Sequence, residues 1–146
     1  MTSVDVSAEG IDLPTWSEKC RIFAEKALKK STDKPNEISI VLCSNDFIHQ
    51  LNRNYWGKDE PTDVLSFPQD EGDGPDGLAG DIVIALEAVS ENADYFGVPF
   101  EEEVKRVIIH GILHLLGWDH SDNSPDQEML KLQEKILNDL GGERLL

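Results

Sequence analysis

The sequence predicts an α+β domain in which a small mixed sheet packs against helices. Two observations predict this fold class. Short segments rich in β-branched residues are interleaved with longer segments whose apolar residues recur at helical spacing. Several of these segments follow one another with short connections, and no internal repeat is visible. We therefore expect residues 1–146 to form one domain around a single core.

The secondary-structure elements can be assigned in chain order. Strands are expected at residues 3–7, 38–43, 63–67 and 81–85, about four in all. Helices are expected to begin near Thr15, Asn45, Leu86, Phe100 and Ser124. The first helix has the capping-box pattern Thr15-x-x-Glu18, and the last has a proline directly after Ser124. Residues 69–80 hold four glycines and four acids without periodicity, which indicates a surface loop.

The helix expected at residues 100–116 carries two histidines four residues apart. Such residues share one helical face, with Cβ atoms about 5–6 Å apart, so His110 and His114 can point at one ion. Gly117 ends the helix, and the following turn can bring His120 towards the same point. Two histidines alone would more often be core residues, but the glycine and the third histidine favour a shared metal. Three imidazoles with an open fourth position are a catalytic zinc ligand set, so we expect one Zn²⁺ ion on His110, His114 and His120.

Hydrolysis is the default reaction of such a site, because zinc lowers the pKa of bound water to about 7. The ligand spacing is zincin-like and matches the extended metzincin pattern. In the H-E-x-x-H zinc peptidases, however, the residue after the first histidine is the glutamate base, and here it is Gly111. A peptidase of that mechanism is therefore disfavoured. Asp119 either orients a ligand imidazole or caps the turn, and the sequence favours neither role.

The charge balance bears on the class of partner. The formal net charge is −16, which argues against generic nucleic-acid binding. Between Gly57 and Glu103 there is one cation, Lys58, against fourteen acids. A polyanionic substrate would therefore need a local cationic cleft centred on the metal. Most of the acidic excess is explained by solubility.

The remaining composition indicates a cytoplasmic protein without a membrane span. No apolar run is long enough to cross a bilayer, and the N-terminus lacks the basic and apolar regions of a signal peptide. Cys20 and Cys43 lie in apolar segments and are expected to be free, buried thiols.

Three motifs resemble those of the bacterial YbeY family of metal-dependent endoribonucleases: HGILHLLGWDH at 110–120, YWGKDEPTDVLSFP at 55–68 and GDIVIA at 80–85. The match runs through nearly the whole chain in order. The resemblance implies a mixed four-stranded sheet covered by helices and a zinc held by the three histidines, in a cleft bordered by the PTDVLSFP segment and the strand of Asp81. It also implies cleavage of single-stranded RNA, processing of the 3′ end of small-subunit ribosomal RNA, and ribosome quality control with the small subunit and its assembly factors as partners.

One position departs from the family pattern. Members commonly carry an arginine, implicated in RNA cleavage, where this chain has Trp56. Tryptophan cannot form the bidentate phosphate clamp of an arginine. Arg53 or Lys58 could contact the phosphate instead, Trp56 could stack a base, or cleavage could be weak in this member. A Trp56 that only packs against the loop, and a Lys58 that is only solvated, are the plain alternatives.

Other polar residues near the motifs have two interpretations each. Thr62 and Ser66 either contact substrate or bind the backbone at an edge strand. Asp63 and Asp81 either hold a second cation or water, or serve the backbone at the start of a strand, which the sequence favours. His49 is expected on a helix surface, away from the metal.

Two functions from different classes follow. The first is a single-strand-specific, zinc-dependent endoribonuclease, with Lys58 and Arg53 contacting phosphate. The alternative is a zinc-stabilised ribosome-assembly factor with little nuclease activity of its own, which the tryptophan and the acidic surface motivate.

Overall fold

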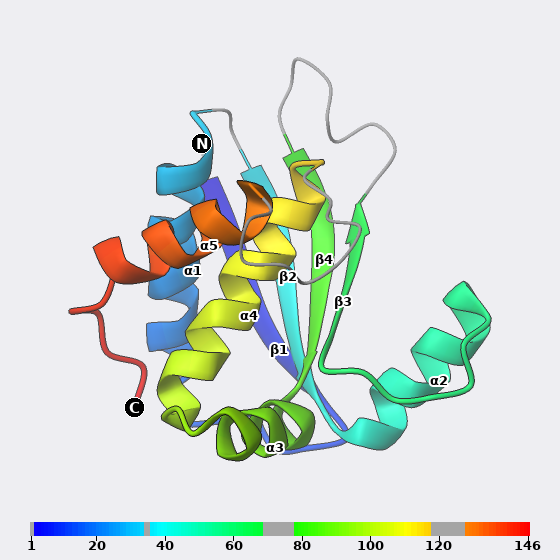
Figure 1. Ribbon diagram of the computed structural model, residues 1–146. Helices are drawn as coiled ribbons and strands as arrows, with labels where there is room; N and C mark the ends of the chain where they lie inside the picture. The colour runs from blue at the N-terminus through cyan, green and yellow to red at the C-terminus, as the bar shows by residue number, and fades with distance from the viewer. Residues whose placement is uncertain (1, 34–35, 69–77, 118–127) are drawn as a thin grey trace.

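The computed structural model describes residues 2–33, 36–68, 78–117 and 128–146, and these ranges contain four strands and five helices (Figure 1). The strands are β1 (Thr2–Glu9), β2 (Asn36–Cys43), β3 (Val64–Pro68) and β4 (Leu78–Ala85). The helices are α1 (Ser17–Ser31), α2 (Asn45–Trp56), α3 (Leu86–Phe96), α4 (Phe100–Leu115) and α5 (Glu128–Asp139). The expected α+β class is confirmed.

The strands form one mixed sheet in the order β1-β2-β4-β3. β1, β2 and β4 are parallel, and β3 pairs antiparallel with β4 at the edge of the sheet. The register places Ser66 of β3 opposite Ile82 of β4, which in turn lies opposite Ile40 of β2. This order puts residues 64–68 of the PTDVLSFP segment on an edge strand, which pairs with a single neighbour, β4, in the described sheet.

The two faces of the sheet are covered unequally. Alternate residues of a strand point to opposite faces, and on one face they meet α1 and α4, with α5 packed on α4 (Figure 1). That layer is the main core, and its fully buried strand residues are Ile40, Leu42, Ile82 and Ile84. On the other face a smaller cluster, with Cys43 and Val83, packs against Ile48 of α2. The main core therefore lies directly beneath α4.

The α4 helix is the central element of the covered layer. It contacts α1, α3 and α5 as well as β3 and β4, and most of its residues after Glu102 are buried. Its first turn carries Glu101, Glu102 and Glu103, where acidic side chains interact favourably with the helix dipole. The helix ends within one residue of the sequence prediction. None of the helices in the described ranges has the length and apolar content needed to cross a bilayer.

Strands β1 and β2 extend one or two residues beyond their predicted bounds. Two larger differences concern α1 and β4, and one predicted helix start lies outside the described ranges. The predicted Thr15 capping box is wrong: α1 begins at Ser17, its N-cap is Trp16 and no side chain caps it. Ser17 N–H donates to the Pro14 carbonyl at 3.1 Å, so Thr15 lies inside a turn, and Glu18 pairs with Arg21 instead. The β4 strand begins at Leu78, within the segment predicted as a loop. The expected helix start at Ser124 falls among residues 118–127, which are not described.

Candidate metal centre

The α4 helix brings His110 and His114 together at one point. Both side chains are half-buried, and their Nε2 atoms lie 3.0 Å apart with ring centroids separated by 4.5 Å. Two nitrogens on one tetrahedral zinc, each 2.0–2.1 Å from the ion, would lie about 3.3 Å apart. The pair therefore has the donor type and near spacing of two zinc ligands.

The third predicted ligand, His120, lies outside the described residues, as does Asp119. Within the described ranges no group of three or more His, Cys, Asp or Glu side chains is placed to hold an ion. The structure thus supplies two of the three predicted imidazoles, and the assignment of His120 stays a prediction.

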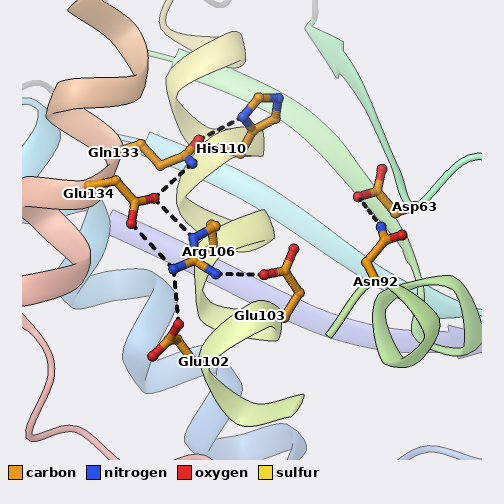
Figure 2. Close-up of polar contacts among 8 residues, drawn as sticks. All are labelled: Asp63, Asn92, Glu102, Glu103, Arg106, His110, Gln133 and Glu134. Atoms are coloured by element: carbon orange, nitrogen blue, oxygen red, sulfur yellow. Dashed lines mark hydrogen bonds and ion pairs between the residues drawn. The ribbon is translucent and has the colours of Figure 1, made fainter. Parts of the chain in front are cut away.

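Behind His110, a buried polar side chain comes from α5. Gln133 is 5% exposed, and its Oε1 lies 2.7 Å from His110 Nδ1 (Figure 2). Its Nε2 donates to Glu134 at 3.2 Å. The sequence prediction did not select Gln133. The available signal was its position on the apolar face of α5, between Met129 and Ile136.

Arg106 extends this chain of contacts along α4. Its guanidinium binds Glu134 on α5 and also Glu102 and Glu103 on its own helix, at 2.6–3.3 Å (Figure 2). Burial acts to raise the pKa of Glu134, but hydrogen bonds from Arg106 and Gln133 outweigh it and lower that pKa below its usual value. Burial likewise acts against the charged form of Arg106, and the three carboxylates outweigh it and raise the Arg106 pKa. Both pKa shifts favour the charged forms of Glu134 and Arg106.

Gly111 lets α4 approach the sheet beside the first histidine. A Cβ at this position would lie 2.7 Å from Ile82 Cγ2, closer than real atoms approach. The Gly111 carbonyl accepts a hydrogen bond from Ser66 Oγ at 3.3 Å, which joins α4 to β3. A glutamate base of the H-E-x-x-H kind has no room here, so the structure gives a physical reason for its absence.

A cleft of about 300 Å³ opens beside the two histidines. Its lining comes from three elements: the last residue of α2, the edge strand β3 and the histidine face of α4. The lining residues are Trp56, Val64, Leu65, Ser66, Pro68, His110 and His114. None of these described lining residues is a lysine or arginine.

Trp56 forms the outer wall of this cleft. The residue is 55% exposed, and its ring stacks on Phe67, with centroids 6.2 Å apart and an interplanar angle of 24°. Tyr55 packs edge-on against the same phenylalanine at 5.5 Å. The helix ends directly after Trp56 because Gly57 adopts the left-handed conformation with φ 70°. Trp56 therefore does pack on β3, and much of its ring is left accessible.

The two predicted phosphate contacts lie near this wall but do not line the cleft. Arg53 is exposed in the last turn of α2, and Lys58 is exposed two residues beyond Trp56. The loop that joins α2 to β3 is fixed by buried Asn52, whose amide donates to the Glu60 carbonyl at 2.9 Å. Contact of Arg53 or Lys58 with substrate stays a prediction.

The remaining polar candidates have partners elsewhere. Asp63 accepts a hydrogen bond from Asn92 of α3 at 3.2 Å, so it joins two elements through side chains (Figure 2). Asp81 lines a groove on the opposite face of the sheet, with Phe67 and Tyr55.

Thr62 Oγ1 lies 3.4 Å from Asp63 Oδ1. His49 pairs with Asp59 at 2.8 Å and does not line the cleft. Cys20 and Cys43 are free and buried, and burial raises the pKa of each thiol to about 12. Neither thiol therefore has the character of a metal ligand.

Known proteins are similar to this chain over most of its length. A family model described as Endoribonuclease YbeY matches residues 4–141. The protein named endoribonuclease YbeY from Treponema pallidum is 49% identical over 142 residues, covering 94% of this chain and 89% of its own. Its counterpart from Treponema denticola is 52% identical over 120 residues, covering 79% and 77%.

The fold has a solved relative as well. The solution structure of TM1509 from Thermotoga maritima is 35% identical, with a TM-score of 0.62, and the match covers 96% of this chain and 90% of that one. The histidine pair on α4, the edge strand beside it and the extent of these matches lead to one conclusion: the chain belongs to the YbeY family.

Proposed function

We propose that this protein is a zinc-dependent endoribonuclease that cuts single-stranded RNA. The names of its relatives support the reaction class, hydrolysis of phosphodiester bonds in RNA. The observation that carries the metal assignment is the 3.0 Å approach of His110 Nε2 and His114 Nε2 at the wall of a cleft. His120 is the proposed third ligand of one Zn²⁺ ion.

The chain's own residues then have separate tasks. His110 and His114 hold the ion, whose chemistry is Lewis acidity towards a phosphoryl oxygen and towards water. The hydrogen bond from Ser66 to the Gly111 carbonyl keeps β3 at a fixed distance from α4. Trp56 offers an exposed ring face at the cleft's outer wall, where an unpaired base can stack. A double helix presents no such free base, so this wall favours single strands.

Basic residues that balance the negative charge of the RNA phosphates must come from outside the described cleft lining, which contains no lysine or arginine. Lys58 and Arg53 are the nearest basic residues in sequence to Trp56, on the loop and helix that carry it. We assign them to phosphates that flank the bond to be cut. Each such contact adds electrostatic attraction that weakens as salt is raised.

The proposed biological substrate is ribosomal RNA, at the 3′ end of the small-subunit species. Partners are the small ribosomal subunit and its assembly factors, and the protein acts as a single domain in ribosome quality control. Family membership supports this assignment. The net charge of −16 does not attract RNA at long range. This supports a model in which the ribosomal partners, rather than the overall charge of the protein, bring the enzyme to its RNA.

The decisive experiment uses a labelled single-stranded RNA and its duplex, with nuclease-free protein. We expect metal analysis to find one zinc per chain and cleavage to be confined to the single strand. His114→Ala should lower the rate by about three orders of magnitude, since losing a metal ligand removes about 4 kcal/mol of transition-state stabilisation. His49→Ala is the matched control, a histidine outside the cleft, and should cut normally. Cleavage that persists with a chelator, or in His114→Ala, contradicts the proposal.

A second candidate function rests on one observation: the described cleft lining holds no lysine or arginine. Trp56 occupies the position at which the family resemblance leads us to expect an arginine. The protein would then be a zinc-stabilised ribosome-assembly factor with little nuclease activity. A large gain in cleavage by Trp56→Arg supports this candidate. If zinc binds only the folded protein, zinc at 100 times its Kd should raise the free energy of unfolding by about 2.7 kcal/mol, and this candidate requires that increase. A metal-free protein that melts almost as high as the loaded one contradicts it.

A further inference from the structure

Gln133 is a buried polar residue on an otherwise apolar helix face. It is 5% exposed, and its neighbours along that face, Met129, Ile136 and Leu137, are buried core residues. Burying an amide costs free energy unless its atoms are hydrogen-bonded. Both polar atoms of Gln133 do have partners, His110 on one side and Glu134 on the other.

The partners determine which way the amide points. An ionised carboxylate only accepts hydrogen bonds, so the amide nitrogen of Gln133 must face Glu134. Arg106 keeps Glu134 ionised and in place, because its Nε donates to the same oxygen at 3.0 Å. The opposite orientation would set two acceptors against each other. The amide oxygen therefore faces His110, at 2.7 Å from Nδ1.

An acceptor at Nδ1 determines the tautomer of His110. A neutral imidazole carries one N–H, and Gln133 Oε1 requires it at Nδ1. The lone pair is then at Nε2, the atom that points to His114. The 3.0 Å contact between the two Nε2 atoms is satisfied in the same arrangement, with His114 as donor.

We propose that Gln133 is the positioning residue of the metal centre, holding His110 as the Nδ1–H tautomer with Nε2 directed at the cation site. Orientation passes from Arg106 to Glu134, from Glu134 to the Gln133 amide, and from the amide to the imidazole (Figure 2). The tautomer is a property of the chain alone. Its effect on zinc affinity rests on the proposed function.

The first test is nuclear magnetic resonance of the metal-free protein at pH 8, where an ordinary histidine is neutral. Long-range ¹H–¹⁵N spectra distinguish protonated from unprotonated ring nitrogens, and His110→Asn identifies the signal. We expect His110 to be protonated at Nδ1 in the wild type. Gln133→Leu should shift the proton to Nε2. A wild-type His110 protonated at Nε2, or an unchanged tautomer in Gln133→Leu, overturns the proposal.

The second test is zinc affinity, measured by competition with a coloured chelator. Loss of a partner behind a ligand histidine typically weakens metal binding about 10–100-fold, and we expect this for Gln133→Leu. Gln50→Leu, the same change at an exposed position of α2, should bind zinc within about threefold of wild type. Equal zinc affinity in wild type and Gln133→Leu overturns the positioning role. A wild type that binds no zinc overturns the proposed function instead, and the tautomer measurement still decides the role of Gln133.

Discussion

The two walls of the cleft are built in opposite ways. On the α4–α5 wall, the ligand His110 is supported from behind by Gln133, Glu134 and Arg106, whose polar atoms bind one another. On the α2–β3 wall, the outermost side chain is an aromatic one, and Trp56 is 55% exposed. One wall is a hydrogen-bonded scaffold, and the other is an accessible surface.

This difference assigns two tasks. A metal ligand must be held within a fraction of an ångström, which requires buried and mutually satisfied partners. A surface for a flexible single strand needs accessible ring faces that accept any base. We therefore expect changes on the first wall to act on stability and metal affinity, and changes on the second to act on RNA binding.

The largest expected effect is that of Arg106→Met on folding stability. The change leaves Glu103, whose side chain is 8% exposed, without its cation, and it also removes a partner of Glu102 and Glu134. Breaking a buried ion pair costs about 3–5 kcal/mol, and the half-exposed Glu102 and Glu134 reduce this to about 2–4 kcal/mol. Urea unfolding measures the loss.

The matched control is Arg21→Met on α1. Arg21 also binds two carboxylates of its own helix, Glu18 and Glu25, but these pairs are closer to solvent. Exposed pairs of this kind contribute little to stability, so the loss should be much smaller than that of Arg106→Met. Equal losses for the two variants would mean that the α4–α5 wall is not a special scaffold.

The next effect is that of Trp56→Ala on RNA binding. Base stacking on an aromatic side chain is worth about 1–3 kcal/mol, so affinity for a single strand should fall about 5–150-fold. Trp56→Phe should retain part of it. Fluorescence anisotropy with labelled RNA measures the change, and Tyr95→Ala, which removes an aromatic residue 84% exposed on α3, is the control. If Trp56→Ala lowers stability but leaves RNA affinity unchanged, Trp56 only packs on Phe67.

The sequence predicted features within one element of each wall better than it predicted the contacts between elements. Periodicity was enough for α4 and for the shared face of His110 and His114, because residues four apart on a helix must be neighbours. It could not identify Glu134 as a partner of Arg106, since the two are 28 residues apart and meet only when α5 packs on α4. Gln133 was missed for the same reason: its role depends on a histidine of another helix.

Close packing was equally beyond the sequence. Gly111 could be recognised as lacking a base, but not as a point where α4 packs too close to Ile82 to leave room for a side chain. The capping box at Thr15 failed because Pro14 directs the chain into a turn first, and that turn competes with the cap. Patterns within one element are therefore predictable, whereas competition between neighbouring local structures and contacts between elements are not.

The smallest expected effect concerns the pH dependence of folding stability. It tests whether acid weakens the contact between the first turn of α4 and the C-terminal residues. Hydrogen bonds from the backbone N–H groups of Leu145 and Leu146, together with Arg144, outweigh desolvation and lower the pKa of Glu101. A carboxyl group whose pKa is lower in the folded state stabilises the fold above its unfolded pKa, about 4.3, and loses that contribution as pH falls through the folded value. Wild type should therefore exceed Glu101→Gln in stability by about 1 kcal/mol at pH 7, or about 2–4 °C in Tm. The difference should shrink as pH falls below the unfolded pKa, while Glu91→Gln, at an exposed position of α3, should show little difference at either pH. A Tm gap for Glu101→Gln that stays constant from pH 7 to pH 3 would show that the C-terminal residues are held to α4 by packing rather than by this carboxylate.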